Sequence, residues 1–178
     1  MRLLCTILLA RAAVATGCSG RNGGDGKVPM SKESLIRANK GLVTIDHERI
    51  EAFAERHQWE MGTTETGLWY QIYDHGDGDS ARIGLIANMN YTVSLLDGTV
   101  CYSSDSTGSK SFVIGHGGVE SGLEEAILMM RVGDKARFIM PPHLAHGLPG
   151  DNNKIPARST IVYQVELLNL TDCELKND

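Results

Sequence analysis

The chain has 178 residues, of which 42% are hydrophobic and 6% aromatic, and it carries a formal net charge of −5. This length is enough for one well-buried core with an appendage, and the composition is that of a soluble globular protein. The acidic balance argues against a protein that wraps nucleic acid. No segment reaches 18 consecutive apolar residues, so the sequence predicts no membrane-spanning helix.

The beginning of the chain has the pattern of a secretion signal. Arg2 precedes the short apolar run LLCTILLA, and small residues follow up to Cys18. This order is typical of a lipoprotein signal, in which the cysteine is lipidated and becomes the first residue of the mature chain. Arg11 interrupts the run, so two alternatives stay open: a cleaved signal followed by an ordinary cysteine, or a merely apolar N-terminus. We predict a lipoprotein signal peptide over 1–17, a lipid anchor on Cys18 to a membrane of the bacterial cell envelope, and a flexible tether over 18–29.

Residues 30–65 form a predicted helical extension. Ser31 is placed to start a helix through SKESLIRANK, and Asp46 is a plausible N-cap for HERIEAFAERHQW. In the second segment, residues at spacings of three and four share one helix face. These residues are Ile50, Phe53, Ala54 and His57. The extension has three candidate roles: it packs on the following domain, it dimerises, or it holds that domain away from the membrane.

From Thr66 onward the periodicity changes from that of a helix to that of strands. Apolar and polar residues alternate in several short segments, and Asp97 with Gly98 provides a tight hairpin turn between two of them. The predicted strands cover 68–74, 87–96, 99–104, 111–115, 134–140 and 160–168.

A single helix interrupts the strands. Ser121 and Glu124 have the spacing of a capping box, and Gly133 is placed to end the helix. One apolar stripe runs along it, formed by Leu123, Ala126, Ile127 and Met130. Strands, one helix and two further strands predict an α+β fold whose antiparallel sheet wraps the helix.

The last two predicted strands are separated by the long segment PPHLAHGLPGDNNKIPARST, residues 141–160. Its four prolines, two glycines and Asp-Asn-Asn run fit neither a helix nor a strand. Loops longer than about 12 to 15 residues in a compact domain are usually functional or disordered. The segment is therefore a candidate binding loop.

Several motifs together resemble the FK506-binding class of peptidyl-prolyl cis-trans isomerases, or rotamases. LLDGTVCYSS, FVIGHGGVESGLEEAILMMRVGDKARFIMPP, AHG, KIP and STIVYQVELL occur in the family's order and nearly at its spacing, within residues 66–171. The resemblance implies a sheet wrapped around one helix and catalysis on proline-containing polypeptide clients. It also implies weak binding of macrolides. The signal and helical preface resemble the lipoprotein isomerases associated with gliding motility in some bacteria.

In that family the long loop overhangs an apolar cleft that receives a proline side chain. Rotation about an Xaa-Pro bond crosses a barrier of about 20 kcal/mol that amide resonance creates, so a site that favours the twisted amide accelerates it without a nucleophile. The resemblance places the following residues at the cleft: Tyr91, Tyr102, Phe112, Val119, Glu120, Leu123, His146, Ile155 and Tyr163.

Five positions depart from the family's pattern. Cys101 and Tyr102 stand where an aromatic residue and an aspartate are usual. Glu120 replaces an aliphatic residue whose backbone amide holds the substrate, Leu123 replaces an aromatic floor, and His146 replaces a loop tyrosine that donates a hydrogen bond. Two functions follow as hypotheses: an isomerase that assists the folding of exported proteins in the cell envelope, or a chaperone or assembly module with little catalysis.

The remaining cysteines and histidines suggest no cofactor. Cys101 and Cys173 could pair in an oxidising envelope or stay as two inert thiols. His143 and His146 lie three residues apart, but no carboxylate or cysteine stands at ligand spacing, so we predict no metal site.

Overall fold

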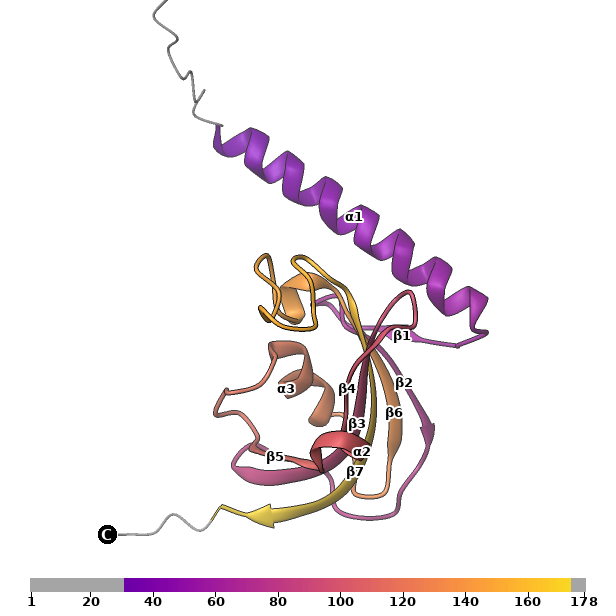
Figure 1. The fold of residues 1–178 in the computed structure, drawn as a ribbon. Helices are drawn as coiled ribbons and strands as arrows, with labels where there is room; N and C mark the ends of the chain where they lie inside the picture. The colour runs from indigo at the N-terminus through magenta and orange to yellow at the C-terminus, as the bar shows by residue number, and fades with distance from the viewer. Residues whose placement is uncertain (1–30, 174–178) are drawn as a thin grey trace, which may run out of the picture.

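The structure is a computed structural model that describes residues 31–173. The predicted signal peptide, the tether and the lipidated Cys18 lie outside these residues. Figure 1 shows a curved sheet with helix α3 on its concave side and the long helix α1 on the opposite side. The elements in chain order are α1 (Lys32–Arg56), β1 (Gly62–Thr63), β2 (Trp69–Asp74), β3 (Leu85–Leu95), β4 (Val100–Ser103), α2 (Ser104–Thr107), β5 (Lys110–Val113), α3 (Ser121–Ile127), β6 (Lys135–Met140), the 3-10 turn η1 (Pro142–Leu144) and β7 (Ile161–Asp172).

All strand pairs in the seven-stranded sheet are antiparallel, in the order β1-β2-β6-β7-β3-β4, with β5 pairing β3. The longest ladder joins β3 to β7, from Leu85 opposite Asp172 to Leu95 opposite Ile161. The predicted alternation along β3 is confirmed, because Met89 and Val93 are buried. The predicted α+β fold, an antiparallel sheet wrapped around one helix, is therefore confirmed.

All four residues of the predicted apolar stripe are buried on the concave side, three of them on α3 and Met130 just beyond its end. Two details of the prediction are wrong. The helix ends at Ile127 rather than near Gly133, and Ser121 and Glu124 form no capping box, since the N-cap is Glu120 without a side-chain bond. The Glu124 carboxylate instead accepts hydrogen bonds from the backbone of the preceding loop.

Helix α1 is continuous from Lys32 to Arg56 and confirms Ser31 as its N-cap, because Ser31 Oγ accepts from the N–H of Ser34 at 3.2 Å. The prediction that Asp46 caps a second helix is wrong, because Asp46 lies in the middle of α1. Its carboxylate is satisfied from outside the helix, by Arg158. No helix within residues 31–173 is long and apolar enough to cross a bilayer.

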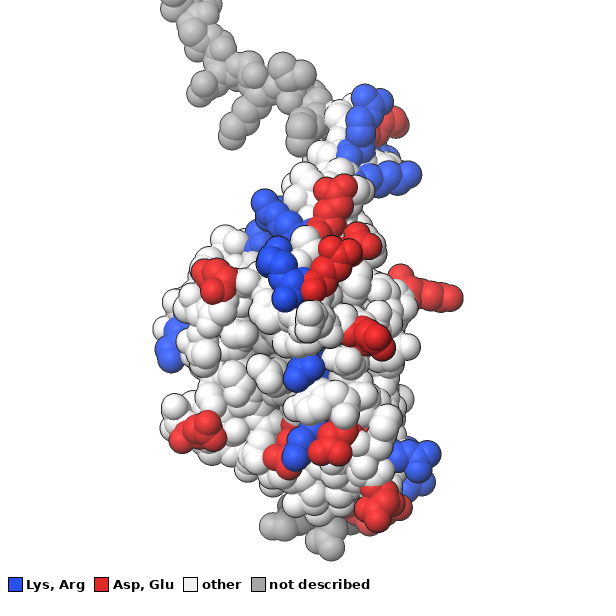
Figure 2. Space-filling model, turned by 90° about the vertical axis from the view of Figure 1, so that its right-hand side faces the viewer, with Lys and Arg blue, Asp and Glu red and all other residues white. Residues whose placement is uncertain are grey.

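The second half of α1 packs against the convex face of the sheet. Ile50 and Phe53 form a small buried cluster with side chains from β2, β6 and β7, namely Trp69, Ile139 and Val162. The first half projects beyond the sheet in Figure 1, and charges of both signs are interspersed along it in Figure 2. The sheet therefore has a helix on each face. Strand β1, which pairs with β2, lies within residues 30–65, the predicted helical extension.

Candidate active site

The floor of the predicted cleft is apolar and buried. Leu123 from α3, Ile155 from the long loop and Tyr163 from β7 are at most 2% exposed. Four further predicted residues pack around this floor and are partly buried, namely Tyr91, Tyr102, Phe112 and Val119. The pairing of β3 with β7 brings Tyr91 and Tyr163 together, with ring centroids 6.2 Å apart.

The rim of the cleft is polar and centres on Glu120. Tyr163 Oη donates to Glu120 Oε1 at 3.0 Å, and His146 Nε2 lies 3.1 Å from the same oxygen. Lys110 Nζ lies 3.6 Å from Glu120 Oε2, which is buried and has no hydrogen-bond partner among the described residues. One carboxylate therefore ties β7 to the long loop across the mouth of the cleft.

The hydroxyl of Tyr163 keeps its proton in this arrangement. Burial raises the pKa of Tyr163 far above its ordinary value, and the nearby negative charge of Glu120 raises it further. The phenol is therefore a permanent donor to Glu120 rather than an acid or base.

His146 faces the cleft and not the solvent side of the loop. Its side chain is 27% exposed and meets Glu120 at the rim. Two of the departures from the family pattern, Glu120 and His146, are therefore in direct contact.

The long loop is fastened to the sheet by a residue that sequence reasoning missed. Asp151 Oδ2 accepts a hydrogen bond from Tyr102 Oη, and Asp151 Oδ1 accepts from the N–H groups of Asn153 at 2.9 Å and Ile155 at 2.8 Å. The signal for the local half was present, because Asp in a turn commonly binds the backbone that follows it. The contact with Tyr102, 49 residues away, has no sequence signal.

This clasp shifts the pKa values of both partners. Partial burial works to raise the pKa of Asp151, but the hydrogen bonds from Tyr102 and the two amides outweigh it and leave the pKa below its ordinary value. The hydrogen bond to Asp151 raises the pKa of Tyr102. An aspartate and a hydroxyl therefore meet beside the cleft, although the sequence has no aspartate at the strand position where the family usually has one.

The loop before α3 is held by Glu124. Its carboxylate accepts from the N–H groups of Gly115 at 2.6 Å and Gly117 at 3.0 Å, and both glycines have positive φ. This loop carries Val119 and Glu120 to the cleft. No described residue accepts a hydrogen bond from the backbone N–H of Glu120.

The cysteines and histidines add no further chemistry to the cleft. Cys101 is buried, and burial raises the pKa of its thiol; both Cys101 and Cys173 are free. Within residues 31–173, no group of three or more histidine, cysteine or acidic side chains is arranged to hold a metal ion.

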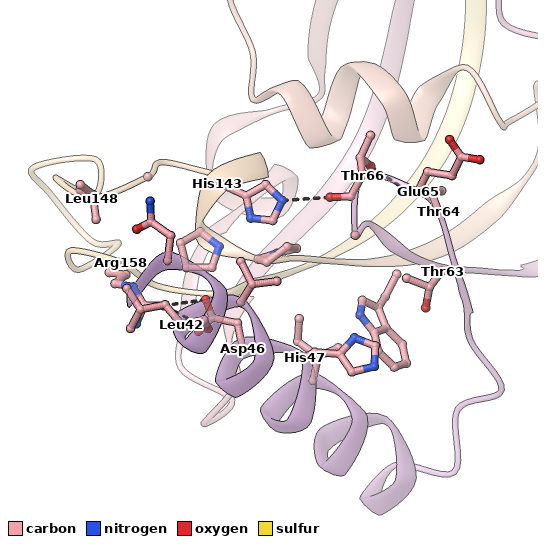
Figure 3. A pocket seen from close by; sticks show the side chains of 18 residues that line it. Leu42, Asp46, His47, Thr63, Thr64, Glu65, Thr66, His143, Leu148 and Arg158 are labelled. Carbon is pink, nitrogen blue, oxygen red and sulfur yellow. Dashed lines mark hydrogen bonds and ion pairs between the residues drawn. The ribbon is translucent and has the colours of Figure 1, made fainter. Parts of the chain in front are cut away.

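A pocket of about 640 Å³ lies elsewhere, between α1 and the outer side of the long loop (Figure 3). Leu42 and Asp46 line it from α1, and His143 and Leu148 line it from the loop. None of the nine predicted cleft residues lines this pocket, so the loop separates two different surfaces.

The chain matches the FKBP-type peptidyl-prolyl cis-trans isomerase family over residues 78–168. It is 35% identical over 112 residues to FK506-binding protein 2 of Yarrowia lipolytica, covering 62% of this chain and 78% of that protein. It is 37% identical over 143 residues to the FKBP-type peptidyl-prolyl cis-trans isomerase FkpA of Aeromonas hydrophila, covering 80% of this chain and 50% of the relative. A 22 kDa isomerase of Escherichia coli is 36% identical over 111 residues, which are 62% of this chain and 53% of that one. The chain thus spans about half the length of the two bacterial relatives.

Solved structures agree with the sequence relatives. The crystal structure of AtFKBP13 superimposes with a TM-score of 0.60 and 29% identity, covering 62% of this chain and 98% of that one. The crystal structure of FkpA from Escherichia coli gives a TM-score of 0.63 and 25% identity, covering 81% of this chain and 75% of that one. The chain belongs to the FKBP-type peptidyl-prolyl cis-trans isomerase family.

Proposed function

We propose that the protein isomerises Xaa-Pro bonds in exported polypeptides and so assists their folding in the cell envelope. The observation that supports the proposal is that seven of the nine residues that the resemblance places at the cleft belong to or pack against one apolar core cluster, while the other two, Glu120 and His146, contact each other. Of the seven, Leu123, Ile155 and Tyr163 are buried, and the Tyr163 hydroxyl donates to Glu120.

This geometry suits the twisted amide. A proline ring on the apolar floor leaves water, and an amide that leaves water loses part of the solvation that favours its planar, polar form. The N–H of Glu120 can hold a substrate carbonyl while the bond rotates. Because the twisted nitrogen is no longer conjugated, an apolar surface around it costs little, and the transition state is bound better than the ground state.

A protease-coupled assay of cis-to-trans conversion tests the proposal. A short Xaa-Pro peptide should convert faster with the wild-type protein than without it, and Ile155→Asp, which places a charge on the floor, should abolish the acceleration. Glu60→Gln, an exposed change outside the cleft, is the matched control. A wild-type rate equal to the uncatalysed rate would refute catalysis.

A second candidate is a binding module with the same cleft and little catalysis. The observation that favours it is the rim, where Glu120 is bonded to both Tyr163 and His146 and occupies the mouth. In this case the protein should suppress aggregation of an unfolding client protein. Its isomerisation rate on a short Xaa-Pro peptide should be close to the uncatalysed rate. Client protection and peptide isomerisation, measured on the same preparation, separate the two candidates.

We also propose that residues 66–171 are held at a membrane by a lipid on Cys18, with residues 30–65 as spacer. The order of apolar run, cysteine, helical extension and isomerase domain supports this, and it supports kinship with the gliding-motility lipoproteins. A lipidated N-terminus contributes roughly 0.8 kcal/mol per buried methylene to membrane binding. In cells, the wild-type chain should sediment with membranes and Cys18→Ser should be released. A fully soluble wild-type chain after processing would refute the anchor.

A further inference from the structure

Arg158 connects α1 to the long loop that overhangs the cleft. Its guanidinium Nη2 donates to Asp46 Oδ2 at 2.8 Å and to the carbonyl of Leu42 at 3.4 Å (Figure 3). Among the described residues, these two bonds are the hydrogen bonds that join α1 to the loop. All the hydrogen bonds from α1 to the loop are therefore made by one side chain of the described residues, that of Arg158.

The Asp46–Arg158 ion pair is largely buried and is not an exposed surface pair. The Asp46 side chain is 10% exposed and that of Arg158 is 29% exposed. Aspartate is a poor residue for a helix interior, since its side chain competes for the backbone. Removing one partner would leave the other charge partly buried and unpaired, which is more costly than losing an exposed pair.

On the loop side, the backbone of Arg158 reaches the residue next to His146. Arg158 has φ of 55°, a left-handed conformation that a non-glycine residue keeps only when its surroundings hold it there. In this conformation its N–H donates to the carbonyl of Gly147 at 3.1 Å. His146, the preceding residue, contacts Glu120 at the rim. Asp46 is thus linked to the cleft through Arg158, Gly147 and His146.

The pocket of Figure 3 lies beside this link. It is lined by α1 and by part of the loop, and Leu148 on its lining is exposed, so apolar packing between loop and helix is interrupted there. His143 Nε2, 2.9 Å from the carbonyl of Thr66, holds the start of the loop, and Arg158 holds its end.

We propose that Asp46 and Arg158 are positioning residues for the isomerase reaction: helix α1 fixes the loop, and the loop holds His146 at the mouth of the cleft, where its ring can bind a substrate carbonyl. The inference rests on the proposed isomerase function and deepens it. It makes the second half of α1 part of the isomerase machinery and not only a spacer.

The test compares two substitutions on α1, each of which removes one negative charge. Asp46→Asn should lower kcat/KM on a short Xaa-Pro peptide by about tenfold, since a small displacement of a positioned group has effects of this order or larger. Glu51→Gln, at an exposed position of α1, should leave kcat/KM unchanged. Equal activity of the two variants would overturn the proposal.

A double-mutant cycle separates positioning from general destabilisation. In a His146→Ala background, Asp46→Asn should lower kcat/KM by less than twofold, because the residue that it positions is gone. A loss that is equally large with and without His146 would overturn the proposed route. Each variant is assayed at a temperature at which its unfolding curve shows it to be folded.

Hydrogen exchange keeps this test independent of catalysis. The amides of Asp151 and Arg158 are hydrogen-bonded within the loop, and Asp46→Asn should accelerate their exchange while Glu51→Gln should not. If the wild-type protein shows no isomerisation, the proposed function fails, and faster loop exchange in Asp46→Asn would still show the coupling. Unchanged exchange would overturn the coupling itself.

Discussion

The floor of the cleft consists of apolar side chains, whereas its rim consists of polar ones. The floor consists of side chains such as Leu123 and Ile155, which belong to the main hydrophobic core and are buried. The rim consists of polar side chains: Glu120, which contacts His146, and the hydrogen-bonded clasp between Tyr102 and Asp151. The floor cannot change without loss of stability, whereas the rim can change the function while the fold persists.

The largest expected effect is on the floor and concerns stability. Leu123→Ala removes fully buried atoms and leaves a cavity, so the free energy of unfolding should fall by about 2–5 kcal/mol. Leu128→Ala makes the same chemical change at the end of α3, where the side chain is 42% exposed, and should cost much less. Urea denaturation of both variants measures the difference, and equal losses would contradict the distinction between floor and surface.

The next effect is on the rim and concerns ligand binding. Glu120 places a charge at the mouth and Leu123 lacks an aromatic surface, so FK506 should bind more weakly than micromolar. Glu120→Ile should tighten binding by at least about tenfold, which is about 1.4 kcal/mol. Glu120→Gln keeps the shape without the charge and should give an intermediate result. Calorimetric titration measures the Kd of FK506 for the wild-type protein and both variants. Submicromolar binding by the wild-type protein would show that the rim does not weaken ligand binding.

A smaller effect is expected at His146. Its side chain contacts Glu120 at the rim, at the position where the family resemblance implies a tyrosine that donates a hydrogen bond to the substrate. His146→Tyr should therefore have a higher kcat/KM than the wild-type protein, and His146→Ala should have a lower one. Equal kcat/KM values for wild type, His146→Tyr and His146→Ala would exclude a role for this histidine.

The smallest effect is expected at the clasp. The pKa of Asp151 is lowered in the folded protein, so its hydrogen bonds stabilise the fold above the ordinary pKa of an aspartate, about 3.9, and are lost as pH falls through the lower folded value. Tyr102→Phe should slightly lower the unfolding midpoint at neutral pH. The two proteins should converge in acid well below pH 4, and a constant difference down to that pH would contradict the clasp.

How far the sequence predicts the structure depends on the distance between partners. Strand alternation and the stripe of α3 depend on neighbours in the chain, and both are confirmed. The capping predictions at Asp46 and Ser121 are wrong because both side chains bind partners outside their own helices. Asp46 accepts from Arg158, and Ser121 donates to the carbonyl of Leu144. Asp46 is paired with a residue 112 positions away, and Asp151 binds Tyr102, 49 positions away. Such pairs depend on how the loop folds back, which local patterns do not encode.

The isomerisation rates of wild type and Glu120→Ile on the same Xaa-Pro peptide, with Ile155→Asp as the inactive reference, decide whether the cleft is catalytic. We expect measurable acceleration by the wild-type protein, a several-fold higher kcat/KM for Glu120→Ile, and no acceleration by Ile155→Asp. A wild-type rate equal to background, or a Glu120→Ile variant that is less active than wild type, would contradict a functional apolar floor beneath a restraining polar rim.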